Sequence, residues 1–455
     1  MNAKKLLTSS AIYGILNFLP LASRFFLFPI FVNFLNPFDF GIIGLHATIA
    51  SFMTILISGG LDSAFSRYYF DYEKDPRQLD QFFKTILVMV FIGGLALGAI
   101  LMLIGRPVYS LLFEDGRYTF FPYGVYSYLM AFGTSINAII LIYFRNKEQP
   151  INYLIFSGSC FLLMVLFETY AIFELSPDAD TVLIARLLGL FIPSLVFWFL
   201  TIRTGLYFDW LRLKPAFKFG FPIFIYLLLG FFYLNYDRIL VSNLLSIGQL
   251  SVYNAAITIA AILEISLQAI DMAILPTIYR WYSASEHEKI NRLLRYMGLF
   301  TLGLISIILV ASPSFITKYT PPFYAEALAL IPIFIIGYIG RYYLGVMNKP
   351  LYFHKKVNQL PLVNIAAGAV LIAGNLLLIP VIGLLGAAIS MALSRMIMIP
   401  IIIYLAHSKT NQIPQLKAIN LYFLILTLLL LGCTFHPHIN NISFFSYYLT
   451  STLLA

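Results

Sequence analysis

The chain has 455 residues, of which 60% are hydrophobic and only 11% are charged, and its formal net charge is +9. Soluble domains carry about 25% charged residues, so this chain has too few charges to coat a globule of its size. Its apolar residues gather in runs of roughly 20, the length that crosses a bilayer core, which excludes an ordinary soluble domain and predicts an all-α polytopic membrane protein.

In chain order, the apolar runs predict twelve core transmembrane helices, at 9–35, 42–66, 84–104, 122–144, 151–173, 181–203, 217–242, 250–280, 293–312, 324–347, 360–380 and 383–406. The first run is too long for the apolar core of a cleavable signal peptide, so we interpret it as a membrane helix. One or two C-terminal helices are expected to follow. The run 419–435 is long enough to span, whereas 442–455 is either a short helix or an interfacial tail.

The basic residues are distributed unevenly between the connections. If the N-terminus is cytoplasmic, 21 of the 29 Lys and Arg residues fall on the cytoplasmic side, Lys349 among them. Only Arg106, Arg117 and Lys318 fall in the opposite connections. This asymmetry is the positive-inside pattern of membrane proteins. The basic excess is therefore topological, and it argues against nucleic-acid binding.

The two halves of the chain have a parallel layout. A shift of 210 residues places the first two helices on the seventh and eighth, and each pair precedes a charged cytoplasmic segment. Because six helices separate equivalent points, the repeat is parallel. We therefore predict an N-terminal six-helix lobe at 1–204, a cytoplasmic linker at 205–216, a C-terminal six-helix lobe at 217–406, and extra helices at 407–455.

Ten charged residues fall inside the predicted spans: Asp62, Glu168, Asp237, Glu264 and Asp271, with Arg24, Arg186, Arg238, Arg341 and Arg395. A charge in the bilayer core is costly and usually faces a partner or a wet cavity. These residues are therefore where function is sought.

Three arginines are candidates for binding an anionic substrate. Arg24 lies midway through the first span, between Pro20 and Pro29, which favour a bend. Arg395 lies midway through the twelfth span. Arg341 is nearer the cytoplasmic end of the tenth span, where a long side chain can also snorkel to the surface. For Arg24, the alternative to substrate binding is an internal ion pair.

Glu264, Gln268 and Asp271 have the spacing i, i+4, i+7, which puts all three on one face of a helix. Such a polar stripe either binds a coupling cation, a proton or sodium, or neutralises the arginines. The residues alone leave both readings open.

Two further pairs suggest structural or gating roles. Glu168 and Arg186 lie at similar depth in an antiparallel hairpin, which favours an ion pair between them. Asp237 and Arg238 are neighbours in sequence, so their side chains diverge by about 100° on a helix and need not pair. Both are predicted near the outer end of the seventh span.

The sequence shows no enzyme constellation. There is no phosphate-binding Gly loop followed by Lys-Ser/Thr and no nucleophile elbow. The two cysteines and six histidines lack metal-ligand spacing. We therefore expect no catalytic residue, no metal and no cofactor, although coupling to a proton or sodium gradient is compatible with the acidic stripe.

Several junctions resemble those of one transporter superfamily. They are the prolines and Arg24 of the first span, the turn at 36–41, the segment 236–238 with 247–256, and the turn at 382–388. In order and spacing they are similar to the multidrug/oligosaccharidyl-lipid/polysaccharide exporter superfamily, above all to its bacterial polysaccharide-biosynthesis and O-antigen flippases. The resemblance covers most of the chain from the first span to the twelfth.

The resemblance implies a V-shaped central cavity, alternating access, and a polyprenyl-diphosphate-linked oligosaccharide as substrate. It also implies residence in the bacterial inner membrane, contact with membrane lipid and with polysaccharide polymerase machinery, and a role in O-antigen, capsule or exopolysaccharide synthesis. Arg24 and Arg395 are then first choices for the diphosphate. The alternatives are a cation-coupled drug or metabolite antiporter, for which Glu264 and Asp271 would be essential, and a non-transport membrane component of polysaccharide assembly.

Overall fold

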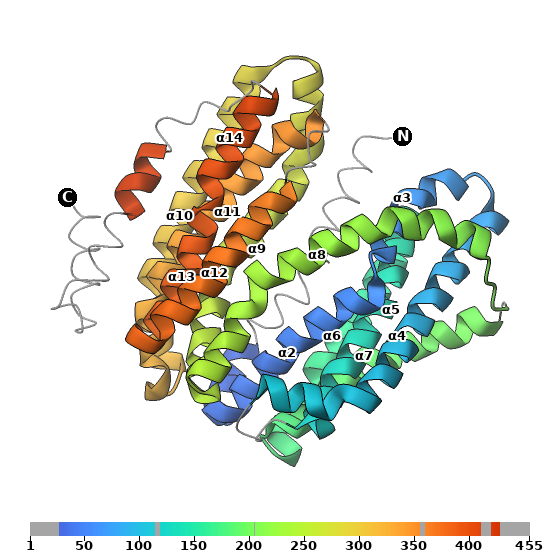
Figure 1. The fold of residues 1–455 in the computed structure, drawn as a ribbon, viewed down its shortest axis with the longest axis horizontal. Coiled ribbons are helices and arrows are strands. Elements are labelled where there is room, and N and C mark those ends of the chain that lie inside the picture. Colours follow the sequence, from blue (N-terminus) through green and yellow to red (C-terminus); the bar gives the residue numbers. More distant parts are fainter. Residues whose placement is uncertain (1–26, 114–118, 204, 355–359, 411–419, 428–455) are drawn as a thin grey trace. The chain divides into compact units, whose positions relative to one another are not determined.

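A computed structural model describes residues 27–113, 119–203, 205–354, 360–410 and 420–427 (Figure 1). Every regular element in these ranges is helical. Eleven of the described helices are long and apolar enough to cross a membrane. They match, one for one, the spans predicted from 42–66 to 383–406, which confirms a polytopic all-α membrane protein. The predicted helix at 442–455 and most of those at 9–35 and 419–435 lie outside the described residues.

Contacts along the chain divide it into two compact units, Met1–Phe231 and Phe232–Ala455, here called unit 1 and unit 2. The division falls inside α8 (Trp210–Leu244). The start of this helix contacts unit 1, since Arg212 Nη1 donates to the Gln78 carbonyl over 2.9 Å. The lobe boundaries drawn from the sequence, with a linker at 205–216, stay a prediction.

Unit 1 is built around α5 (Val125–Asn146), which contacts every other full helix of the unit up to α7. The helices before it are α2 (Pro37–Ser58), α3 (Leu61–Tyr72) and α4 (Pro76–Leu112). Those after it are α6 (Pro150–Tyr170) and α7 (Ala179–Arg203). Short π-helical turns, Phe120–Gly124 and Ala171–Leu175, precede α5 and extend α6.

The expectation of one continuous helix over 42–66 was wrong, because the chain breaks at Gly59 and Gly60. Both have positive φ, 52° and 77°, a region open mainly to glycine. A Cβ on Gly60 would meet the carbonyl oxygen of Gly220 in α8 at 2.2 Å. Two glycines thus end α2, begin α3 and let α8 approach closely.

Unit 2 is built around α11 (Ala327–Phe353), which packs against α9 (Ile247–Ser283), α10 (His287–Tyr319), α13 (Leu384–Met396) and α14 (Met398–Thr410). A 3-10 turn, Pro322–Glu326, precedes it, and α12 (Leu360–Ile382) completes the unit against α13 and α14 (Figure 1). α11 is buried around most of its circumference, as expected for a helix at the centre of a bundle. Any charge on it must therefore be satisfied within the protein.

Candidate functional site

Charged side chains from three helices of unit 2 meet around α11. We call Glu264, Asp271, Arg341, Lys349 and Arg395 the charge cluster. Glu264 and Asp271 come from α9, Arg341 and Lys349 from α11, and Arg395 from α13. The spacing predicted for α9 holds, since Gln268 Nε2 donates to Glu264 Oε1 over 3.3 Å.

The first ion pair of the cluster joins α13 to α9. Arg395 Nη1 lies 2.9 Å from Glu264 Oε2. The guanidinium also lies over the ring of Tyr338 on α11, with Cζ 4.4 Å from the centroid, a cation–π distance. The Arg395 side chain is only 7% exposed, so these contacts replace most of its water.

Close packing of α11 on α13 positions this pair. A Cβ on Gly340 would lie 2.6 Å from the Arg395 carbonyl oxygen, so only glycine permits the approach without a shift. Small residues at such contacts let membrane helices come together. Gly340 therefore fixes where the Arg395 backbone, and hence its guanidinium, can lie.

The second ion pair joins α11 to α9. Lys349 Nζ lies 2.6 Å from Asp271 Oδ1 and donates to the Gly345 carbonyl over 2.8 Å. The Lys349 side chain is 4% exposed. A Cβ on Gly345 would lie 2.6 Å from Asp271 Oδ2, so this glycine leaves the room that the carboxylate occupies.

Arg341 lies between the two pairs without joining either closely. Its Nε is 3.8 Å from Glu264 Oε1, and its Nη1 is 3.8 Å from Asp271 Oδ2. Both distances exceed a hydrogen bond, although the guanidinium lies within electrostatic reach of both carboxylates. Its side chain is 24% exposed, more than any other member of the cluster.

The cluster holds three cations and two carboxylates. Each carboxylate already has one cation at hydrogen-bond distance, Arg395 or Lys349. Arg341 is the surplus charge, and the N–H groups of its guanidinium fork can still donate to the oxygens of a carboxylate or a phosphate. Among the described residues, no group of three His, Cys, Asp or Glu side chains is placed to hold a metal ion.

From the sequence, Lys349 was placed in the connection after the tenth span, and its placement outside a helix was wrong. α11 runs on through Pro350 to Phe353, so Lys349 lies inside a candidate membrane span and is buried. Its position eight residues after Arg341 put it on the same helical face, and this spacing was the available signal. Tyr338, three residues before Arg341, shares this helical face and was also missed.

Asp237 and Arg238 do not form an ion pair with each other in the described structure; each has another partner. Asp237 is 2% exposed and accepts a hydrogen bond from the hydroxyl of Tyr253 on α9, at 2.5 Å. Arg238 Nη1 donates to Asn235 Oδ1 over 2.7 Å. Asp237 thus ties the end of α8 to the start of α9, while its structural or gating role stays a prediction.

In unit 1, Arg186 and Glu168 are in contact. Arg186 Nε on α7 lies 2.5 Å from Glu168 Oε1 on α6, and the Glu168 side chain is fully buried. The pair links α6 to α7. Its structural or gating role in transport stays a prediction. Arg24, the remaining candidate from the sequence, lies outside the described residues.

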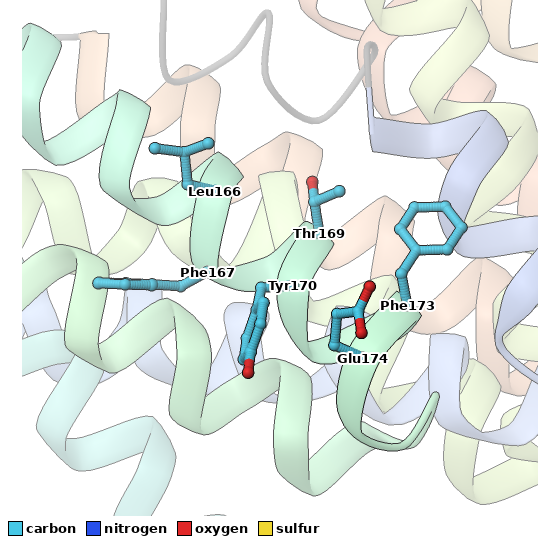
Figure 2. A pocket seen from close by; sticks show the side chains of 6 residues that line it. All are labelled: Leu166, Phe167, Thr169, Tyr170, Phe173 and Glu174. Carbon is cyan, nitrogen blue, oxygen red and sulfur yellow. The ribbon is translucent and has the colours of Figure 1, made fainter.

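An apolar groove of about 570 Å³ lies along α6 and the turn that extends it, in unit 1. Figure 2 shows its lining residues, Leu166, Phe167, Thr169, Tyr170, Phe173 and Glu174. Leu166, Tyr170 and Phe173 are more than half exposed. No member of the charge cluster lines the groove, whose open apolar walls fit contact with lipid tails.

A comparison with protein families finds one matching model, described as "Polysaccharide biosynthesis protein", over residues 30–320. Glu264 and Asp271 lie inside this range, whereas the three cations of the charge cluster lie beyond it. A search of curated proteins finds no match.

Solved structures of similar fold cover nearly the whole chain. An inward-facing multidrug resistance MATE family transporter of the MOP superfamily aligns with a TM-score of 0.64 and 14% identity, covering 89% of this chain and 95% of its own. The lipid II flippase MurJ, in an inward closed conformation, aligns with a TM-score of 0.60 and 17% identity, covering 97% and 96%. A MOP superfamily transporter from Pyrococcus furiosus aligns with 0.57 and 16%, covering 90% and 95%. At these identities the likeness shows the fold.

Proposed function

The chain belongs to the polysaccharide biosynthesis protein family, and on that premise we propose that it is a flippase for a polyprenyl-diphosphate-linked oligosaccharide. It moves this substrate across the bacterial inner membrane by alternating access, for the synthesis of O-antigen, capsule or exopolysaccharide. The N-terminus is cytoplasmic, and the product passes to polysaccharide polymerase machinery.

The surplus cation of the charge cluster is the observation that carries the proposal. A diphosphate brings two or more negative charges, and the arginine fork matches phosphate oxygens with two parallel hydrogen bonds. Arg341 has no carboxylate within hydrogen-bond distance among the described residues and is the most exposed cation of the cluster. It is therefore the residue best prepared to receive the diphosphate.

The two ion pairs then act as a frame for Arg341. Arg395 holds Glu264 on one side and Lys349 holds Asp271 on the other. Held this way, the carboxylates stay near Arg341 without neutralising it through hydrogen bonds. The Arg341 guanidinium makes no hydrogen bond to either carboxylate, each of which lies 3.8 Å away. A bound diphosphate would accept hydrogen bonds from it in the geometry that the guanidinium prefers. Arg395 contributes to the same positive field, and Arg24 is proposed as a second diphosphate contact.

The ion pairs also bear on the alternative function. An antiporter of organic cations needs a carboxylate that is free to meet its substrate, and both carboxylates of the cluster already hold a cation. The same pairing favours neutralisation of the cations over ion coupling as the role of the Glu264, Gln268 and Asp271 stripe.

Binding of undecaprenyl diphosphate to the full chain in lipid nanodiscs tests the proposal. Arg341→Ala is expected to weaken binding roughly tenfold to a hundredfold, because hydrogen bonds to charged groups contribute about 1.5–3 kcal/mol. Arg295→Ala, at an exposed arginine of α10, is the matched control and leaves binding unchanged. Undecaprenol, which lacks the diphosphate, is the control ligand. Equal binding of undecaprenol, or full binding by Arg341→Ala, contradicts the proposal.

The role of Arg24 needs its own variant. Arg24→Ala is expected to abolish polysaccharide export in cells while the protein still inserts into the membrane. Full export by this variant, at matched membrane abundance, removes Arg24 from the diphosphate site.

A further inference from the structure

A buried histidine in unit 1 has no part in the site described so far. His46, ten residues into α2, is fully buried. Its Nδ1 lies 2.7 Å from the Ser127 hydroxyl oxygen on α5. Its Nε2 has no hydrogen-bond partner among the described residues. One ring nitrogen is therefore hydrogen-bonded, and the other has no partner among the described residues.

Two tyrosine rings lie near the imidazole at small interplanar angles. Its centroid is 5.2 Å from that of Tyr123, at an interplanar angle of 21°, and 6.3 Å from that of Tyr109, at 8°. The Tyr123 ring lies within the distance of about 6 Å at which an aromatic ring interacts with a cation.

The acidic groups of this region lie beyond Tyr123, not against the histidine. α7 contributes Asp180, which the Tyr123 hydroxyl contacts, with Asp178 just before the helix, and α2 itself contributes Asp39. α4 presents Tyr109 to the ring, and its Arg106 lies over Phe121 instead, 5.2 Å from the centroid. α5 presents Ser127. Tyr123, which is partly exposed, thus neighbours both the buried ring and three carboxylates.

We propose that His46 is a proton-binding site of unit 1, and that its occupancy is coupled to movement of the substrate. The Nε2 lone pair accepts the proton while Nδ1–H donates to the Ser127 oxygen, which gives an imidazolium beside the rings of Tyr123 and Tyr109. The coupling rests on the proposed transport function, whereas the proton site itself does not. Both carboxylates of the charge cluster hold cations, whereas the buried His46 ring keeps an Nε2 with no hydrogen-bond partner among the described residues.

Burial supplies the coupling. An imidazolium without a carboxylate partner is costly in a closed, apolar site, so His46 gains a proton only in a conformation that opens Nε2 to water or to Asp180 through Tyr123. It releases the proton when the site closes. Two conformations with different proton affinities are what coupling requires, and by linkage the proton in turn favours the open one.

The proton site is tested directly on the full chain. Nitrogen-15 NMR of histidine-labelled protein in nanodiscs follows each imidazole from about pH 5 to about pH 8, and His46→Gln identifies the His46 signals. We expect reversible protonation of His46 in this range. In Ser127→Ala the midpoint falls by about one pH unit, since the imidazolium loses its acceptor. A His46 that stays neutral throughout, or a midpoint that Ser127→Ala does not move, overturns the proton site.

Coupling is tested in proteoliposomes with undecaprenyl diphosphate as the probe. An imposed pH gradient is expected to accelerate its translocation by wild type and by His287→Gln, a control at an exposed histidine of α10. His46→Gln still moves the probe down its concentration gradient but loses the acceleration. Full acceleration in His46→Gln overturns the coupling. If wild type moves no probe at all, the transport proposal fails, while the NMR titration still decides the proton site.

Discussion

Arg395 Nη1 donates to Glu264 Oε2 over 2.9 Å and ties α13 to α9 inside unit 2. Neither side chain is more than 16% exposed, so neither can lose its partner to water without cost. The pair also sets the position of Glu264 Oε1, the oxygen 3.8 Å from Arg341. The stability of this pair and the availability of Arg341 are therefore linked.

Breaking the pair from one side is expected to destabilise the protein strongly. Glu264→Ala leaves the Arg395 charge buried and unpaired, which lowers the free energy of unfolding by roughly 3–5 kcal/mol. The double variant Glu264→Met, Arg395→Met removes both charges at similar volume and recovers most of that loss. Unfolding in detergent, followed by intrinsic fluorescence, measures all three proteins. A double variant no more stable than Glu264→Ala would mean that the two side chains are not coupled.

The close approach of α11 and α13 predicts that two glycines respond oppositely to alanine. Gly340→Ala places a Cβ 2.6 Å from the Arg395 carbonyl oxygen, so we expect a loss of about 1–3 kcal/mol. Gly303, inside α10, has nothing within 4 Å of an added Cβ, and Gly303→Ala is expected to gain about 0.4–1 kcal/mol. Thermal unfolding of both variants in one detergent checks the contrast, and equal shifts would argue against the packing.

The burial of Lys349 predicts how it reacts with a water-soluble amine reagent. Its side chain is 4% exposed and bonded to Asp271 and Gly345, whereas the Lys289 side chain is 57% exposed. Mass spectrometry after brief labelling of the folded protein should find Lys289 modified and Lys349 protected until the protein unfolds. Equal labelling of the two lysines would show that Lys349 is exposed to water and would contradict its burial.

Asp75, the residue before α4, lies outside the candidate membrane spans and gives the start of this helix a pH dependence. The backbone N–H of Gln78 and its side-chain amide donate to Asp75 and hold the pKa of that carboxyl below its ordinary value. Because the folded value is the lower one, the stabilisation is present above about pH 3.9 and is lost as the pH falls through the folded pKa.

Hydrogen exchange of the first turn of α4, corrected for its intrinsic rate, checks this expectation. Protection should fall on acidification in wild type and in the exposed control Glu73→Gln. Asp75→Asn, whose amide oxygen still caps the helix, should show a flatter profile. The same acid response in all three proteins would assign the effect to another group.

Much of the fold was predictable because a membrane span needs a long apolar run, and such runs are visible in sequence. The break at Gly59 and Gly60 was not, since two glycines inside an apolar run also occur in continuous helices. The break accompanies the close approach of Gly60 to Gly220, which belongs to a helix about 160 residues later in the chain. Sequence spacing carries no information about such a contact.

Some features of the charge cluster could also be predicted from the sequence, and others could not. Glu264, Gln268 and Asp271 were predicted to share a face because periodicity within one helix is local. Their pairing with Arg395 and Lys349 depends on how α9, α11 and α13 pack, and no spacing encodes that. Lys349 was misplaced because Pro350 normally marks a helix end, yet α11 continues past it. His46 drew no notice, since its partners Ser127 and Tyr123 are 81 and 77 residues away.

The most direct test is translocation of an undecaprenyl-diphosphate-linked oligosaccharide by the full chain in proteoliposomes, measured as the rate at which the sugar becomes accessible to an external glycosidase. Wild type and Arg295→Ala should move the substrate at the same rate, and Arg341→Ala should be slower by tenfold or more at equal reconstitution. An Arg341→Ala protein that moves the substrate at the wild-type rate would contradict the account.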